Sequence, residues 1–208
     1  MIRVGKNKRD RWFVLIVAAA VVVVGAMVFA FCNLEAIMDL FIGRGDYDVE
    51  ITAAAGKHGL DPDLVRALIY QESRFRPNTR GKKGEISLMQ VLPSGAAAEW
   101  ARVNKRSRPS SLALYNVELN LDIGCWYLAW AKRRWRTYAH GTELALAEYN
   151  AGTSRAREWA PKAPDGEVIP RVKIASTRKY VSDIMKRYRK YAAETAEAER
   201  KRSAIGEK

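Results

Sequence analysis

The sequence of 208 residues predicts an all-α domain preceded by one N-terminal transmembrane helix. Apolar residues recur at helical spacing through most of the chain, and no run of alternating β-branched residues is long enough to predict a strand. An apolar content of 48% argues for a folded protein. The chain that remains after the N-terminal segment has about the length of one domain.

The N-terminal apolar run extends without interruption from Trp12 to Phe31. An α-helix of about 20 residues, rising about 1.5 Å per residue, crosses the roughly 30 Å hydrocarbon core of a bilayer. Five basic residues precede the run against one acidic residue, which predicts a cytoplasmic N-terminus and a domain on the outer side. A cleaved signal peptide is the alternative, but its apolar region would be shorter and would end in small residues, whereas Phe31 is bulky.

Composition divides the chain into five parts. They are a cytoplasmic basic tail (1–11), a transmembrane anchor (12–34), a juxtamembrane linker (35–47), the globular domain (48–191) and a charged tail (192–208). The last part has almost no large apolar residues, and we therefore expect it to be a frayed helix or disordered.

Six helices are expected in the globular domain. They cover residues 48–58, 62–74, 87–101, 117–136, 142–150 and 176–191. The second begins at Asp61-Pro62, where a capping carboxylate precedes a proline whose fixed φ suits the first turn. Three prolines and a glycine between Pro161 and Pro170 predict a long loop, which either lines a substrate groove or is a plain connector.

Glu72 occupies an unusual position for a carboxylate, because it continues an apolar helical face. The residues that precede it on this face are Leu64, Val65, Leu68 and Ile69. A carboxylate in low-dielectric surroundings resists ionisation, and an acid that keeps its proton at neutral pH can protonate a glycosidic oxygen. The alternative is a solvent-exposed side chain paired with Arg74 or Arg76, and position alone does not separate the two.

Four segments in a fixed order connect Glu72 to a known family. They are 70–75 (YQESRF) with Pro77-Asn78, 84–90 (GEISLMQ), Pro93 and 147–152 (AEYNAG). This set resembles the catalytic domain of the soluble-lytic-transglycosylase-like (SLT) family, enzymes of lysozyme-like fold that cleave the glycan strand of peptidoglycan. The resemblance spans about residues 48 to 191. Each motif alone is weak, and their order and spacing make the match specific.

The resemblance implies a mechanism with one acid. Glu72 would protonate the glycosidic oxygen between N-acetylmuramic acid and N-acetylglucosamine, and its carboxylate would then deprotonate the muramoyl C6 hydroxyl. That hydroxyl attacks C1 and forms a 1,6-anhydro ring. Most glycosidases need a second carboxylate, but this route consumes no water for that carboxylate to activate.

The resemblance also implies supporting roles. Tyr149 would bring its hydroxyl to the acid or the sugar, Met89 and Gln90 would line the sugar site, and Asn150 would hold the loop backbone or contact substrate. Without the resemblance, a core tyrosine, a core methionine and a helix-capping asparagine are the simpler interpretations.

Three positions depart from the family pattern. Gly81, Glu85 and Ser87 stand where serine, alanine and glycine are usual in the family. We expect Glu85 either to make an extra polar contact in the cleft or to be a solvated loop residue. Ser73 cannot replace the missing serine, because neighbouring residues in a helix do not face each other.

No cofactor and no metal site are expected. His58 and His140 are far apart in the sequence, lack other ligands at ligand spacing and are predicted to be surface residues. Cys32 lies at the end of the apolar run and Cys125 in a helical stretch, which makes a disulfide between them improbable.

The formal charge of +13 raises nucleic-acid binding as a rival function. No nucleic-acid motif is present, and a domain outside the cytoplasm would not meet that partner; attraction to anionic cell-wall polymers accounts for the charge equally well. The sequence therefore predicts a membrane-anchored peptidoglycan lytic transglycosylase, single-pass in the bacterial inner membrane with its domain on the periplasmic side. The alternatives are a lysozyme-type hydrolase and a catalytically silent glycan-binding or assembly scaffold protein.

Overall fold

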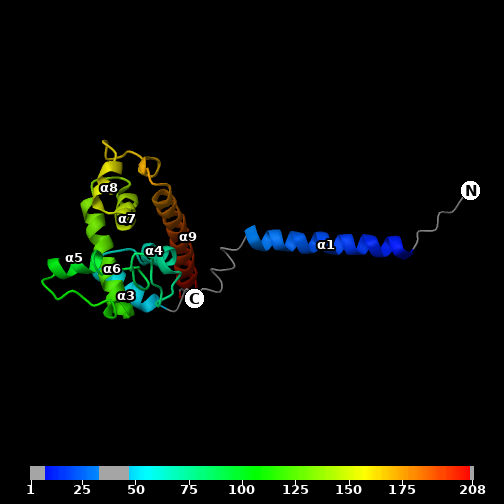
Figure 1. Ribbon diagram of the computed structural model, residues 1–208, viewed down its shortest axis with the longest axis horizontal. Coiled ribbons are helices and arrows are strands. Elements are labelled where there is room, and N and C mark those ends of the chain that lie inside the picture. Colours follow the sequence, from blue (N-terminus) through cyan, green and yellow to red (C-terminus); the bar gives the residue numbers. More distant parts are fainter. Residues whose placement is uncertain (1–7, 33–46, 207–208) are drawn as a thin grey trace, which may run out of the picture. The chain divides into compact units, whose positions relative to one another are not determined.

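The computed structural model describes residues 8–32 and 47–206 of the chain, which form two separate units (Figure 1). The first contains helix α1 (Lys8–Cys32), whose large apolar side chains are exposed, among them Trp12 and Phe29. Over the residues described, none of the helices has both the length and the apolar character needed to cross a membrane. The predicted linker, 35–47, lies outside the described residues except for Tyr47.

The second unit is helical, as predicted. Its elements are α3 (Asp48–His58), α4 (Pro62–Ser73), α5 (Ala96–Val103), η1 (Ala113–Tyr115), α6 (Val117–Arg134), α7 (Gly141–Ala151), α8 (Thr153–Trp159), η2 (Ile169–Arg171) and α9 (Ala175–Gly206). Extended pairing within the described ranges is limited to two isolated bridges, Arg80 with Ile86 and Ile86 with Val91. The expected loop from Pro161 to Pro170 is present up to the short turn η2.

The core forms around α6, which packs against α3, α5 and α7, while α9 packs along α4 and α7 (Figure 1). Fully buried side chains supply these contacts; among them are Leu64, Leu68, Leu121, Ile123, Leu128, Leu144, Leu146 and Ile184. Burying one such side chain contributes about 1.5–3 kcal/mol. The packing therefore fixes α4, α7 and α9 together, although these helices are far apart in the sequence.

Local interactions and backbone conformation fix both ends of helix α4. The Asp61 carboxylate accepts a hydrogen bond from the backbone N–H of Asp63 at 2.8 Å, which confirms the predicted cap. Tyr188 of α9 donates to the other oxygen of Asp61 at 2.7 Å. At the far end, Arg74 and Phe75 both adopt left-handed conformations, with φ of 54° and 56°. The helix therefore stops directly after the turn that carries Glu72.

The predicted helix over residues 87–101 is wrong for its first part, because α5 begins only at Ala96. Ser87 and Gln90 have φ of 67° and 47°, which no α-helix contains. The backbone N–H of Met89 donates to the side chain of Asn120 at 2.9 Å instead of to a helical carbonyl. Residues 87–95 thus form a loop held in place by α6.

The structure also bears on two further expectations, of which the surface position of His58 is wrong. The charged segment after residue 191 is helical in the structure, because α9 continues to Gly206. Ion pairs at helical spacing, such as Lys201 with Glu197 at 2.6 Å, support this extension. His58 is not a surface residue: its side chain is only 13% exposed, and Nε2 lies 2.7 Å from Asp122 Oδ1. His140 is partly covered as well.

Candidate active site

Glu72 lies in the last turn of α4, and its carboxylate is mostly shielded from solvent. Tyr180 of α9 donates a hydrogen bond to Glu72 Oε1 at 2.5 Å. Burial raises the pKa of Glu72 to about 7; the Tyr180 hydrogen bond lowers it, and the negative charge of Glu85 raises it. Burial therefore favours the protonated form of Glu72, and of the two alternatives for this residue the structure supports the shielded carboxylate.

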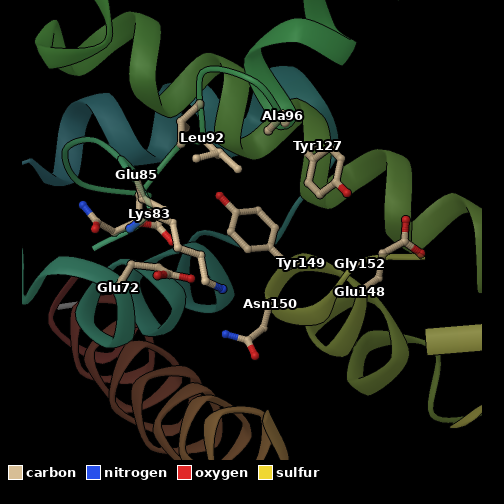
Figure 2. A pocket seen from close by; sticks show the side chains of 13 residues that line it. Glu72, Lys83, Glu85, Leu92, Ala96, Tyr127, Glu148, Tyr149, Asn150 and Gly152 are labelled. Atoms are coloured by element: carbon tan, nitrogen blue, oxygen red, sulfur yellow. The ribbon is translucent and has the colours of Figure 1, made fainter. Parts of the chain in front are cut away.

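A cavity of about 260 Å³ opens beside Glu72. Figure 2 shows side chains from four segments around it: Glu72 from α4, Lys83 and Glu85 from the loop that follows, Tyr127 from α6, and Tyr149 with Asn150 from α7. Gln90 and Gly152 also line it. The structure thus brings five of the six predicted site residues to one cavity.

Tyr149 does not contact the acid through its hydroxyl. Instead, the hydroxyl donates to the backbone carbonyl of Met89 at 2.9 Å, and the ring packs edge-on against Tyr127. Burial keeps the pKa of Tyr149 well above its usual value, so the hydroxyl retains its proton. The residue that contacts Glu72 is Tyr180.

Met89 is the predicted site residue that the cavity excludes, because its side chain is completely buried. Its sulfur lies 3.9 Å from Cys125 Sγ, and a Cβ added to Gly124 would fall only 2.4 Å from it. Met89 is therefore a core residue whose carbonyl holds Tyr149. Gln90 does line the cavity, and its amide donates to the carbonyl of Ser87 at 2.7 Å.

Asn150 and Glu85 occupy opposite sides of the cavity (Figure 2). Asn150 accepts a hydrogen bond from the hydroxyl of Thr177 at 2.8 Å, which connects α7 to the start of α9. Glu85 accepts one from the backbone N–H of Lys83 at 2.9 Å. Of the two alternatives for Glu85, the structure supports the polar group in the cleft.

Glu148 also borders the cavity, but its carboxylate is already engaged. It forms an ion pair with Arg134 and accepts hydrogen bonds from Trp135 at 2.8 Å and Thr153 at 3.0 Å. The side chain is fully buried, and Figure 2 shows it on the Gly152 side of the cavity. A carboxylate with this many fixed partners serves to hold α6, α7 and α8 together.

Sequence reasoning missed Tyr180 as a site residue, since it lies 108 positions after Glu72. The sequence predicts a helix over residues 176–191 but no role for its residues. The signal that could have revealed Tyr180 is its place in the first turns of this helix. The described parts of the chain contain no group of three or more histidine, cysteine, aspartate or glutamate side chains that could hold a metal ion.

The structure shows a helical domain in which the largely buried carboxylate of Glu72 lies at the wall of a cavity, and comparison with known proteins identifies the class of this domain. Residues 50–169, more than half of the chain, match the profile of the Transglycosylase SLT domain. The chain belongs to this family.

Particular relatives are similar over part of their length. The chain is 36% identical over 85 residues to the membrane-bound lytic murein transglycosylase E of Buchnera aphidicola, covering 40% of this chain and 38% of that protein. It is 36% identical over 77 residues to the endo-type membrane-bound lytic murein transglycosylase A of Klebsiella pneumoniae, covering 36% and 38%. The chain thus spans less than two fifths of these curated relatives.

A solved structure is similar to the domain as a whole. It is an inactive glutamate-to-glutamine mutant of the lytic transglycosylase Slt from Pseudomonas aeruginosa, with a TM-score of 0.63 and 25% identity. The similarity covers 73% of this chain and 24% of that one. The lysozyme-like fold predicted for residues 48–191 agrees with this match.

Proposed function

We propose that the protein is a peptidoglycan lytic transglycosylase that cleaves the β-1,4 bond between N-acetylmuramic acid and N-acetylglucosamine without water. The proposal rests chiefly on one observation: Glu72 lies at the wall of a cavity, and burial raises its pKa to about 7. A group that must first give and then take a proton works best when its pKa lies near the working pH. Membership of the SLT family supports the same reaction.

The contacts of Glu72 suit both halves of this reaction. Tyr180 occupies Oε1, which leaves Oε2 to carry the proton toward the substrate. When that proton moves to the glycosidic oxygen, the bond from this oxygen to C1 breaks, and the Tyr180 hydroxyl stabilises the carboxylate that forms. The carboxylate then accepts the proton of the muramoyl C6 hydroxyl, and the oxygen of that hydroxyl forms the new bond to C1. Glu72 ends protonated again, and no water is consumed.

Product analysis tests this proposal. Purified glycan strands treated with the full chain should release fragments that are lighter by one water than hydrolysed ones and lack a reducible end. Glu72→Gln should lower the rate by about 10²–10⁴-fold, the usual contribution of general acid–base catalysis. Reducible products would show a hydrolase, and retained binding to the strands without any product would show a silent scaffold protein.

The hydrolase alternative has one observation in its favour. Glu85 places a second carboxylate at the same cavity, and glycosidases that use water need such a second group. Glu148 cannot supply it, because Arg134, Trp135 and Thr153 hold both of its oxygens. The mass of the product separates the two reactions directly.

We further infer that residues 12–34 anchor the protein in the bacterial inner membrane, single-pass, with the domain on the periplasmic side. The described helices include none that meets the length and apolar character of a membrane span, so this proposal rests on the sequence of the segment and its basic flank. The exposed apolar side chains of α1 and the names of the two membrane-bound relatives support it.

Localisation of the full chain tests the anchor. The uncleaved protein should stay in the membrane fraction after a high-salt wash, and a reporter that is active only outside the cytoplasm should function when fused after Lys208. A shortened soluble form would show a cleaved signal peptide instead. A cytoplasmic reporter signal would refute the orientation.

A further inference from the structure

The loop between α4 and α5 holds the backbone of Glu85 in a tight turn. The N–H of Gly81 donates to the carbonyl of Glu85 at 2.8 Å, and the N–H of Gly84 donates to the carbonyl of Gly81 at 3.1 Å. The N–H of Ser87 donates to the carbonyl of Thr79 at 2.8 Å, which closes the turn from the outside. Glu85 therefore projects from a fixed backbone.

The side chain of Glu85 occupies space directly beside Gly81 that the Cβ of a larger residue would take. A Cβ added to Gly81 would fall 2.3 Å from Glu85 Oε2 and 2.8 Å from Gln90 Oε1, and both distances are too short for non-bonded contacts. The same Oε2 accepts the hydrogen bond from the N–H of Lys83. The two departures from the family pattern, Gly81 and Glu85, thus fit together sterically.

The carboxylate of Glu85 is not neutralised by an ion pair. Across the part of the chain that the structure describes, no basic side-chain nitrogen lies within 4.0 Å of it. The other groups around Glu72 are Tyr180 from α9 and Tyr149 from α7, both neutral, and the Lys83 side chain at the cavity wall.

Two guanidinium groups contact Tyr70 of α4, and neither belongs to the residues that line the cavity. Arg74, which ends α4, donates a hydrogen bond to the hydroxyl of Tyr70, and its guanidinium lies 4.2 Å from the centre of that ring. Arg187 of α9 lies over the same ring at 3.3 Å. Both are directed at Tyr70 and not at the cavity.

We propose that Glu85 is a positioning residue for the acid–base step, acting on Glu72 through its charge, and that Gly81 is the residue that admits its carboxylate to the site. The inference rests on the proposed function, which requires Glu72 to be protonated when substrate binds. Two carboxylates that share a cavity disfavour each other's ionisation. The negative charge of Glu85 accordingly raises the pKa of Glu72.

Direct titration of Glu72 tests the inference without turnover. The full chain, labelled with ¹³C at glutamate carboxyl groups and kept in mild detergent, is titrated by NMR as wild type, Glu85→Gln and Glu158→Gln. Glu72→Gln assigns the signal by its disappearance. Glu85→Gln keeps the shape and removes the charge, so Glu72 should titrate at lower pH. Glu158→Gln removes one charge from an exposed site away from the cavity, and Glu72 should titrate as in wild type.

Gly81→Ala provides the second test, because the added methyl group must displace the ends of the Glu85 and Gln90 side chains. The Glu72 titration should move in the same direction as in Glu85→Gln. In Glu85→Ala, adding the Gly81→Ala change should cause no further downward movement, since the charge is already gone. Equal Glu72 midpoints in wild type and Glu85→Gln would overturn the inference, as would a Gly81→Ala midpoint that stays at the wild-type value.

The pH–rate profile connects the titration to catalysis. The alkaline limb of kcat/KM, which reports loss of the proton from Glu72, should move to lower pH in Glu85→Gln. A purely structural role would lower the rate equally at every pH and would overturn the inference. Reducible products, or full activity of Glu72→Gln, would refute the proposed function and leave the NMR result standing.

Discussion

Replacing Glu72 with glutamine should stabilise the folded protein above neutral pH while it removes activity. The folded-state pKa of Glu72 is about 7, against 4.5 for an ordinary glutamate. The folded protein therefore binds this proton more tightly than the unfolded chain does, and the free energy of unfolding falls as pH rises from about 4.5 to about 7. Above that range the wild type carries the whole cost of a shielded carboxylate, which glutamine does not carry.

The difference between the two pKa values sets the size of the effect. Each pKa unit corresponds to about 1.36 kcal/mol, so a rise from 4.5 to about 7 gives an upper bound of about 3 kcal/mol. Partial solvent contact of the carboxylate reduces this figure, and we expect about 1–3 kcal/mol between about pH 5 and about pH 8. The amide of glutamine still accepts the hydrogen bond from Tyr180, so the substitution keeps that contact.

Chemical denaturation of the full chain in mild detergent measures this effect. The unfolding free energies of wild type and Glu72→Gln are compared at about pH 5 and about pH 8, with the exposed Glu158→Gln as the matched control. The advantage of Glu72→Gln should grow with pH, while the control follows the wild type at both. An advantage that is absent, or equal at the two pH values, would refute the assignment of Glu72 as a destabilised acid.

Three further predictions concern neighbouring side chains. Tyr180→Phe removes the hydrogen bond that lowers the pKa of Glu72, so the alkaline limb of the pH–rate profile should move to higher pH and the rate should fall by about 10–100-fold. An unchanged profile would contradict this role. Glu148→Gln leaves Arg134 without its charge partner and should lower the free energy of unfolding, measured with urea, by about 2–4 kcal/mol. Equal urea midpoints would contradict it. Asn120→Ala removes three hydrogen bonds from a fully buried side chain and should cost about 3 kcal/mol in the same assay, where a loss below about 1 kcal/mol would show that these bonds are replaced.

Local sequence patterns were sufficient to predict features that depend on a single helix. The Asp61-Pro62 start of α4 was predicted because capping and the proline φ depend only on neighbouring residues. The position of Glu72 on the apolar face was predicted because helical periodicity is also local. This position alone left a solvent-exposed Glu72 as an alternative, and the burial and raised pKa of Glu72 follow from the partners that cover that face.

The features that the sequence could not predict, the loop at 87–95 and the buried side chain of Met89, depend on tertiary contacts. The loop at 87–95 looks helical by composition, but Asn120 of α6 takes the N–H of Met89 and the carbonyl of Ile86, which holds the loop open. Met89 turned inward because Gly124 leaves room for its sulfur. These three contacts each join residues more than 30 positions apart, and no local pattern contains them.

The pKa of Glu72 is best understood as a balance between opposing contributions. Burial and the charge of Glu85 favour the protonated form. The Tyr180 hydrogen bond opposes them by stabilising the carboxylate. If only the contributions that raise the pKa were present, Glu72 would be too weak an acid to protonate the substrate. If only the Tyr180 hydrogen bond were present, Glu72 would already be ionised before substrate bound. We therefore propose that Glu72 can act as acid and then as base because the Tyr180 hydrogen bond opposes the effects of burial and of the Glu85 charge on its pKa.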